Sequence, residues 1–427
     1  MSMESKDDQL TINERSSGAM TDCEKQPPGD TEQETAPNAL HTFPEGGRDA
    51  WLTLLGAVLA QFATFGYVNA FGAYQGWIGS TQVFFILSMG IITGRLFDQG
   101  HLHFLVLTGT FLFAVALFML SLSHENQFYQ VFLSHGLLGG IACGMVYLPS
   151  LGIVSHYFHQ KRALAMGIVA AGASLGAIVY PIMLNELFHS SVGFHNGVRA
   201  SAGMNVGILL VANFLMKTRL PPKKHGPPVR VADFARDSAY VLTNLGGFCS
   251  VAAMFFPIFF VQLFAVKLGI NRTLAFYSTS IMNASSIVGR ILPGLIAVRW
   301  GVYNVIIVVM ACLVALYWSM LAVHDTPGVI IFAIFSGFLT GSCVSLYAPA
   351  IASLARDFNE IGARLGICFT FGGFAGLIGT PVAGALISSN YIWWRGIVFV
   401  GCMMTAGFLF FFIARNILVQ RKGTQIV

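Results

Sequence analysis

Apolar runs of about 20 residues, separated by short charged or turn-forming breaks, recur along the chain after residue 47. A bilayer core of ~30 Å needs about 20 apolar residues per helix, so each run predicts one membrane-spanning helix. The pattern predicts twelve such helices, at residues 51–72, 78–97, 103–122, 129–153, 163–187, 198–216, 239–265, 274–297, 303–323, 328–351, 363–388 and 396–415. The expected fold class is therefore an all-α membrane protein.

Composition supports this class and excludes others. Of the 427 residues, 55% are hydrophobic and 10% are charged, against about 25% charged residues in a soluble domain. These values exclude a soluble enzyme, a disulfide scaffold, a nucleic-acid binder and a disordered regulator. The expected surroundings are a lipid bilayer, and the formal net charge of +5 does not indicate nucleic acid.

Polar segments divide the chain into parts. Residues 1–47 hold ten of the 19 acidic side chains and predict a disordered cytoplasmic tail. The longest polar interruption, 217–238, holds six Lys and Arg residues and separates six spans (48–216) from six more (239–415). It is interpreted as a cytoplasmic linker, and 416–427 as a second cytoplasmic tail. With both termini cytoplasmic, 20 of the 24 Lys and Arg residues lie inside, as the positive-inside rule requires.

The two sets of spans repeat each other. At a shift of 200 residues, Cys143, Tyr147, Pro149, Gly172, Gly176 and Pro181 recur as Cys343, Tyr347, Pro349, Gly372, Gly376 and Pro381. The matches are in register with the helix count. They predict two six-helix bundles related by a pseudo-two-fold axis, an arrangement found in carriers that rock around a central site.

The loop after the second predicted helix reads GRLFDQG, from Gly94 to Gly100, and resembles the major facilitator signature G-x-L-x-D-x-G. Glycine lets this helix approach a neighbour closely, and Asp98 can face a helix N-terminus or an arginine. We expect a conformational lock here. Its expected residues are Gly94, Arg95, Asp98, Gly100, Arg162 and Arg299. In the second copy of the signature Val298 replaces the aspartate, which predicts a weaker lock on that side.

The segment YFHQKRALAMGIVAAG, residues 157–172, resembles the monocarboxylate porter family, as do residues 289–295 and 366–384 in the version typical of fungal members. The resemblance covers roughly residues 46–415 and implies carriage of a small organic solute. The sequence also departs from the animal members of that family. Asn69 stands where animal lactate carriers have a helix 1 lysine. Ser286 stands where they have a carboxylate, four residues before the retained Arg290. Proton symport of a simple monocarboxylate is therefore disfavoured.

Arg290 is the strongest candidate for the solute site. An arginine on a spanning helix costs several kcal/mol unless it faces a partner or a water-filled cavity. Its alternative role is in the conformational lock, and both roles stay open. The other candidates are polar groups on helices that line the cavity in this fold class: Asn69, Asn283, Gln262, Tyr147 and Tyr347. For each of them an interhelical hydrogen bond is the alternative.

Further features carry weaker expectations. His135 is expected at the membrane interface, and the aromatic run 255–260 against lipid, with stacking on a flat ligand as its alternative. Asn271 begins an Asn-Arg-Thr glycosylation sequon. His101 and His103 are a weak metal signal, and no metal site or cofactor is expected. The short connection at residues 72–79 leaves impaired transport as an alternative.

These patterns together predict a non-enzymatic, monomeric plasma-membrane transporter of a small organic solute. It would work by alternating access and export a secondary metabolite. Two alternatives stay open: a proton-coupled monocarboxylate uptake carrier and a non-transporting membrane sensor.

Overall fold

Helices account for almost all of the described chain. The computed structural model describes residues 44–427 except 73–75, 125–126, 220–230, 356–357 and 388–390, so the predicted tail 1–47 lies almost entirely outside the described residues. Within the described part, twelve helical segments are long and apolar enough to cross a membrane. Each coincides with a predicted span, which confirms the all-α membrane class.

The first six spans include several composite helices. They comprise α1 (Arg48–Gln61), η2 (Phe62–Gly66) and α2 (Tyr67–Gly72); α3 (Gly76–Ser88) and α4 (Gly90–Asp98); α5 (Leu102–Ser121); α6 (Phe128–Val131), η3 (Phe132–Leu138), α7 (Gly139–Ile153) and η4 (Val154–His156); α8 (Arg162–His189); and α9 (Gly193–Leu215). The segments η2 and η3 are π-helical, a local widening that is often found at functional sites.

The second six spans are mostly single long helices. They are α11 (Ser238–Lys267), α12 (Arg272–Trp300), α13 (Val302–Ser319) with η5 (Met320–Ala322), α14 (Thr326–Ala352), α15 (Phe358–Ile387) and α16 (Trp393–Lys422). The short α10 (Val231–Ala235) lies within the predicted linker. The last helix extends seven residues beyond its predicted end at 415. Hydropathy marks only its apolar part, whereas the polar end is held by Arg415 and Arg421, which bond to Asn304 and Asp237.

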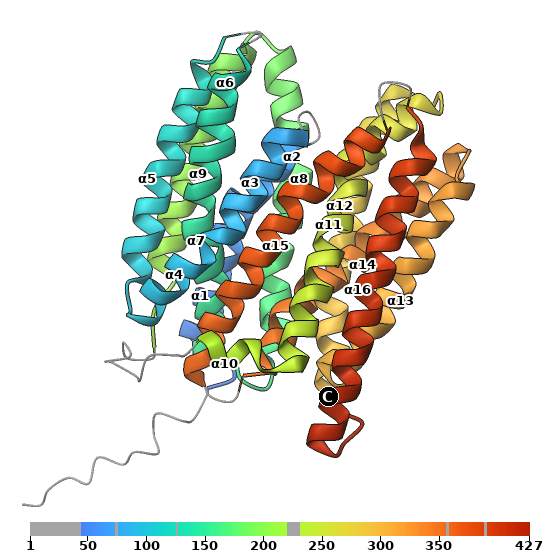
Figure 1. The fold of residues 1–427 in the computed structure, drawn as a ribbon. Coiled ribbons are helices and arrows are strands. Elements are labelled where there is room, and N and C mark those ends of the chain that lie inside the picture. The colour runs from blue at the N-terminus through green and yellow to red at the C-terminus, as the bar shows by residue number, and fades with distance from the viewer. Residues whose placement is uncertain (1–43, 73–75, 125–126, 220–230, 356–357, 388–390) are drawn as a thin grey trace, which may run out of the picture. The chain divides into compact units, whose positions relative to one another are not determined.

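Each set of six spans has its own apolar core. One cluster of buried side chains lies wholly within residues 50–216. The other is built from residues 234–427, together with Val83, Leu87, Leu148 and Met166 from the first set. Figure 1 shows the two sets next to each other, with α5 and α6 toward one edge and α13 and α16 toward the other. The two sets are called the N-half and the C-half below.

Small residues bring the two halves together along two helix pairs. The spans containing α3 and α4 pack on α15, and α8 packs on α12. A Cβ added at Gly366 would lie 3.2 Å from the carbonyl oxygen of Gly90, and one at Gly94 would lie 3.7 Å from that of Gly362. At the other pair, Gly167 packs directly on the carbonyl of Arg290. Such small-residue stripes allow close helix approach where lipid gives no hydrophobic driving force.

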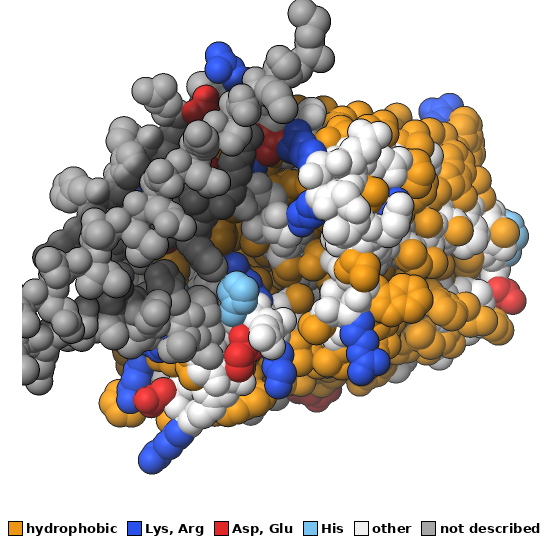
Figure 2. Space-filling view, turned by 90° about the horizontal axis from the view of Figure 1, so that it is seen from below, with side chains coloured by type: hydrophobic (Ala, Val, Ile, Leu, Met, Phe, Trp, Pro, Cys, Tyr) orange, Lys and Arg blue, Asp and Glu red, His pale blue; other side chains and the backbone are white. Residues whose placement is uncertain are grey.

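The side on which α1 begins and α16 ends is called the terminal side. Several Lys and Arg side chains lie on this face (Figure 2). An acidic residue just before the first helix of each half binds near the start of that half's fifth span. Glu45 accepts hydrogen bonds of 2.7, 2.6 and 3.2 Å from the backbone N–H groups of residues 159, 160 and 161. Asp237 forms an ion pair of 3.1 Å with Arg364. Both contacts tie the first helix of a half to its fifth.

Partial burial acts to raise the pKa of the Glu45 and Asp237 carboxyl groups, but in each case hydrogen bonds to the carboxylate lower the pKa by more. Backbone N–H donors hold the pKa of Glu45 below its usual value. Hydrogen bonds from Arg421 and Arg364 do the same for the pKa of Asp237. Both groups are therefore stabilised as carboxylates.

Candidate functional site

A central cavity lies between the halves at mid-helix depth. Residues of α11, α12 and α14 form most of its wall, and the spans that contain η2, α3, α7, α15 and α16 complete it. The cavity is narrow, about 90 Å³ in volume. Its polar side chains include Asn69, Asn283, Ser286 and Arg290, whereas most of the remaining lining is aromatic or aliphatic. A cavity with few polar groups in an apolar wall is typical of sites for small organic molecules.

Arg290 brings a positive charge into this cavity. Its Nη1 donates a hydrogen bond of 2.9 Å to the carbonyl of Ala170 on α8, and its Nε donates one of 3.2 Å to Ser286 Oγ. Within the described part of the chain, no carboxylate forms an ion pair with it. The guanidinium is thus held by neutral acceptors and can attract an anion.

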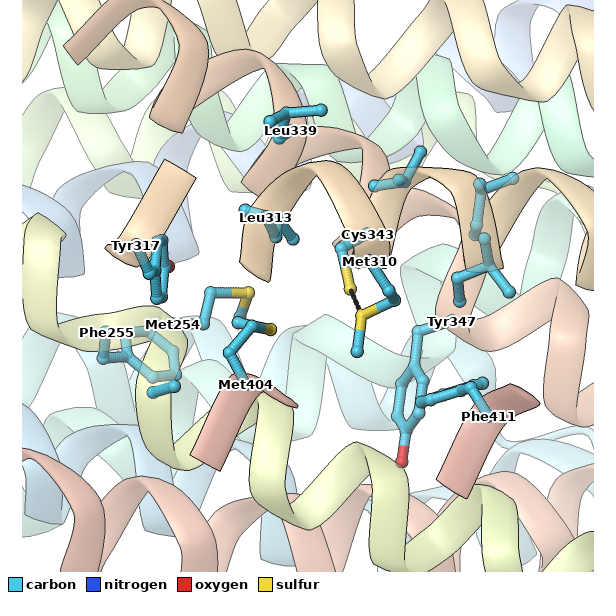
Figure 3. Close-up of a cluster of buried hydrophobic side chains, with 14 of the residues drawn as sticks. Met254, Phe255, Met310, Leu313, Tyr317, Leu339, Cys343, Tyr347, Met404 and Phe411 are labelled. Carbon is cyan, nitrogen blue, oxygen red and sulfur yellow. Dashed lines mark hydrogen bonds between the residues drawn. The ribbon is translucent and has the colours of Figure 1, made fainter. Parts of the chain in front are cut away.

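Aromatic rings from both halves meet at Phe369 of α15. The ring of Tyr147, on α7, lies edge-on to Phe369 at 6.1 Å between centroids, and the ring of Tyr347, on α14, does so at 6.0 Å. Tyr347 also lies beside Phe411 (Figure 3), and their ring centroids are 6.4 Å apart. The two tyrosines are equivalent positions of the 200-residue repeat, so the repeat places matching rings on the two sides of one phenylalanine.

The cavity amides are partly engaged with their own helices. Asn69 donates from Nδ2 to the carbonyl of Phe65, and Asn283 donates to that of Thr279, each at 2.9 Å. One amide donor of each is therefore used locally, which orients both side chains. The rest of each amide group is suited to hydrogen bonding with a polar part of a ligand.

The structure brings five of the six predicted solute-site residues to the cavity: Arg290, Asn69, Asn283, Tyr147 and Tyr347. Gln262 is not among the lining residues. It lies one helical turn beyond Ile258, the last α11 residue on the cavity wall. The prediction had selected the correct helix but could not fix the depth of the cavity along it.

Two other predictions are wrong. In the run 255–260, Phe255, Phe256 and Phe259 are buried inside the protein instead of facing lipid, and Phe255 lines the cavity. His135 is not interfacial: it is 1% exposed, and its ring lies edge-on to Tyr67 at 6.0 Å. Hydropathy identifies an apolar helix, but it does not show which face meets lipid and which meets another helix.

The expected lock residues occupy the terminal side. The carboxylate of Asp98 lies near the start of α15, and a Cβ added at Gly362 would come within 2.7 Å of its Oδ2. Gly100 has a φ of +85°, which favours glycine at this turn. Arg95 and Arg299 are exposed. Arg162 lines a second cavity of about 420 Å³ on this side, together with Val298.

Sequence reasoning missed the anchors formed by Glu45, Asp237 and Arg364. Arg364 is 2% exposed; it pairs with Asp237 and with Glu360 Oε2 at 3.1 Å and lies over the rings of Phe234 and Tyr240. The signal that could have revealed the anchors is an acidic residue just before the first helix of each half. The predicted glycosylation residue Asn271 is exposed, and its side chain caps α12 by accepting a bond of 2.8 Å from the Thr273 N–H.

Comparisons with known proteins agree on the family. The model of the Major Facilitator Superfamily matches residues 50–356. The chain is 34% identical over 397 residues to the aspyridones efflux protein of Emericella nidulans, covering 89% of this chain and 80% of that protein. It is 35% identical over 403 residues to the agnestins efflux protein of Paecilomyces divaricatus, covering 90% and 91%.

Solved structures show the same fold at low sequence identity. The human organic anion transporter MFSD10 matches with a TM-score of 0.68 and 15% identity, covering 86% of this chain and 98% of that one. The Escherichia coli fucose:proton symporter FucP matches with a TM-score of 0.64 and 17% identity, covering 86% and 98%. The family model and the relatives show that the chain belongs to the major facilitator superfamily and is a transporter, not an enzyme.

Proposed function

We propose that this transporter exports a small organic metabolite with a flat apolar body and a negatively charged group. The observation that carries the proposal is Arg290, a cation in an aromatic cavity without a carboxylate partner among the described residues. The relatives named as efflux proteins for aspyridones and agnestins support export of a secondary metabolite.

The cavity suits such a solute chemically. The rings of Tyr147, Phe369 and Tyr347 offer edges and faces for a planar body. A carboxylate or ionised phenol could take charge-assisted hydrogen bonds from Arg290, and Asn69 and Asn283 could bond to further oxygens. The narrowness of the cavity implies that the halves must separate somewhat around a bound solute.

Transport would proceed by alternating access. The contacts at Gly90, Asp98 and Gly167 close the terminal side of the path between the halves. Rocking of the N-half, residues 48–216, against the C-half, residues 239–415, would open this side and close the other. Gly94, Arg95, Asp98, Gly100, Arg162 and Arg299 would regulate this step.

We extend the proposal to the subfamily, the membrane topology and the oligomeric state. The motifs at 157–172 and 289–295 support a relationship to the fungal monocarboxylate porters. The Lys and Arg distribution supports cytoplasmic termini, with 217–238 as a cytoplasmic linker, in the plasma membrane. We also propose a monomer, since each half has its own core and the cavity lies within one chain.

The proposal is tested by transport in proteoliposomes. The probes are 2-naphthoate, a flat aromatic anion, and 2-naphthamide, its neutral analogue, with aspyridones, agnestins and lactate assayed alongside. We expect saturable movement of 2-naphthoate and of at least one of the two fungal metabolites, and little movement of 2-naphthamide. Transport of lactate alone, driven by a proton gradient, would support the uptake alternative, and the absence of any transport would favour the sensor.

A further inference from the structure

A ring of hydrogen bonds joins α8 to α12 beside the central cavity. Ser174 Oγ donates to Ser286 Oγ at 3.2 Å, and Arg290 Nε donates to the same Ser286 oxygen at 3.2 Å. Arg290 Nη1 closes the ring by donating to the carbonyl of Ala170 at 2.9 Å. Ala170 and Ser174 are one turn apart on α8, as Ser286 and Arg290 are on α12. We call these four residues the inter-half ring.

The ring lies where the cavity meets the closed terminal side. Ser286 and Arg290 line the cavity, whereas Ser174 is not among the lining residues and is 1% exposed. Toward the terminal side, Gly167 packs on the Arg290 carbonyl and a Cβ added at Gly294 would lie 3.1 Å from the carbonyl oxygen of Ala163. The helices α8 and α12 therefore cannot separate on the terminal side unless the ring opens.

Solute binding and contact between the halves use the same N–H groups. In the ring, Nε and Nη1 of Arg290 are bonded to a hydroxyl and to a peptide carbonyl, both neutral acceptors. The ring bonds already have an ionised donor, and an ionised acceptor in their place adds attraction between opposite charges, which is strong in an apolar cavity. An anionic solute in the cavity would therefore compete with Ala170 and Ser286 for the guanidinium.

We propose that Ser174 is a positioning residue that holds Arg290 across the halves, through Ser286, until a solute anion takes over its N–H groups. Binding of the solute then releases α8 from α12. This inference rests on the proposed function, because it requires an anionic solute at Arg290. It assigns a role to Ser174, which does not line the cavity, and it makes anion binding at Arg290 and closure of the inter-half ring mutually exclusive, whichever side the solute enters from.

The test uses a reporter cysteine that is hidden while the terminal side is closed. Ala297 is 4% exposed and, like Ala163 of α8, lines the second cavity on the terminal side, so Ala297→Cys would report separation of α8 and α12. The background replaces by serine Cys23, which lies in the predicted tail, and Cys249, Cys312 and Cys402, which are half-buried or exposed. Maleimide labelling is measured on the purified full chain with and without saturating 2-naphthoate, and 2-naphthoate affinity is measured by calorimetry.

The key variant is Ser174→Ala, and Ser174→Gly is a second way to remove the hydroxyl. The matched control is Ser342→Ala, because Ser342 is also fully buried in a span but its hydroxyl bonds only to its own helix at Phe338. Without ligand, we expect Ser174→Ala to label faster than the control by about three- to tenfold, the effect of one lost hydrogen bond. Its affinity for 2-naphthoate should be equal or tighter, which general structural damage would not produce.

The outcomes separate this inference from the proposed function. In the reporter background, 2-naphthoate should accelerate labelling, and Ser174→Ala should reduce that acceleration. If the background protein binds 2-naphthoate but its labelling does not change, the inference is overturned while the anion site stands. Equal ligand-free labelling of Ser174→Ala, Ser174→Gly and Ser342→Ala also overturns it. Failure to bind 2-naphthoate contradicts the proposed anion site and, with it, the competition between the anion and the ring.

Discussion

Arg364 and Asp237 form an ion pair of 3.1 Å in which the two side chains are only 2% and 5% exposed. Asp237 precedes the first helix of the C-half, and Arg364 lies in its fifth span, so the pair fixes two helices at the terminal side. Asp237 also receives a bond from Arg421 on α16. This buried pair therefore joins three helices of one half and helps that half to move as a unit.

Asp237→Asn should destabilise the protein strongly. Removing one partner of a buried ion pair leaves an uncompensated charge and costs about 3–5 kcal/mol. The matched control is Asp49→Asn, which breaks an exposed pair with Lys217 whose side chains are 62% and 61% exposed. An exposed pair contributes about 1 kcal/mol or less. Thermal unfolding in detergent measures the stability of the two variants. Equal melting temperatures would contradict the structural role of Asp237.

The same pair predicts a pH dependence. Burial acts to raise the pKa of Asp237, but hydrogen bonds from Arg421 and Arg364 bring it below the ordinary value of 3.8. A folded-state pKa below the unfolded one gives stability that is present above that ordinary value and is lost as the pH falls through the lowered pKa. The melting temperature difference between the wild type and Asp237→Asn should be constant from neutral pH to about pH 4 and shrink only in stronger acid. A difference that shrinks near neutral pH would contradict the lowered pKa.

Gly247 and Tyr347 should behave as a coupled pair. A Cβ at Gly247 would collide with the hydroxyl of Tyr347, which lines the cavity. Gly247→Ala should therefore displace the ring and lower transport of 2-naphthoate. Tyr347→Phe removes the nearest of the colliding atoms and leaves the ring atoms Cζ and Cε2 at 2.5 and 2.7 Å from the added Cβ. Gly247→Ala combined with Tyr347→Phe should therefore recover part of the transport that Gly247→Ala loses. Transport rates of the two single variants and the double variant give the coupling, and strictly additive effects would refute the contact.

Asp98→Asn should favour opening of the terminal side. The Asp98 carboxylate lies near the N-terminal end of α15, where a negative charge is favourable by about 0.3–1 kcal/mol. The amide loses that charge at nearly constant shape. Labelling of the Ala297→Cys reporter should rise about two- to fivefold. The control is Asp325→Asn, which alters an N-cap residue of α14 at the opposite end of the helices; a similar rise there would show a nonspecific effect.

Much of the fold follows from the sequence, because lipid imposes a long apolar run on every span. The repeat also identified Tyr147 and Tyr347 as equivalent, and both meet Phe369. Residues that depend on helix rotation or depth were harder to assign. Gln262 lies on a cavity-lining helix but one turn beyond the cavity. Phe256 is buried, although the apolar residues around it in the sequence do not distinguish a buried position from one that faces lipid.

Partners that are distant in sequence were difficult to identify from local patterns. Glu45 binds the backbone 114 to 116 residues away, and Asp237 binds Arg364 at a separation of 127. Each acidic residue lies just before the start of a helix, and a charged residue in that place is ordinarily interpreted as part of a solvated loop. The inter-half ring is similar, since Ser174 and Ser286 are unremarkable serines until α8 and α12 are placed together.

The central claim is that Arg290 attracts an anionic solute in the aromatic cavity. Calorimetric binding of 2-naphthoate to Arg290→Gln, compared with Arg272→Gln at an exposed arginine of the same helix, tests it most directly. We predict that Arg290→Gln weakens binding by about tenfold or more, the loss of a charge-assisted hydrogen bond, and that Arg272→Gln leaves it unchanged. Equal affinity of the Arg290→Gln variant and the wild type would contradict the account.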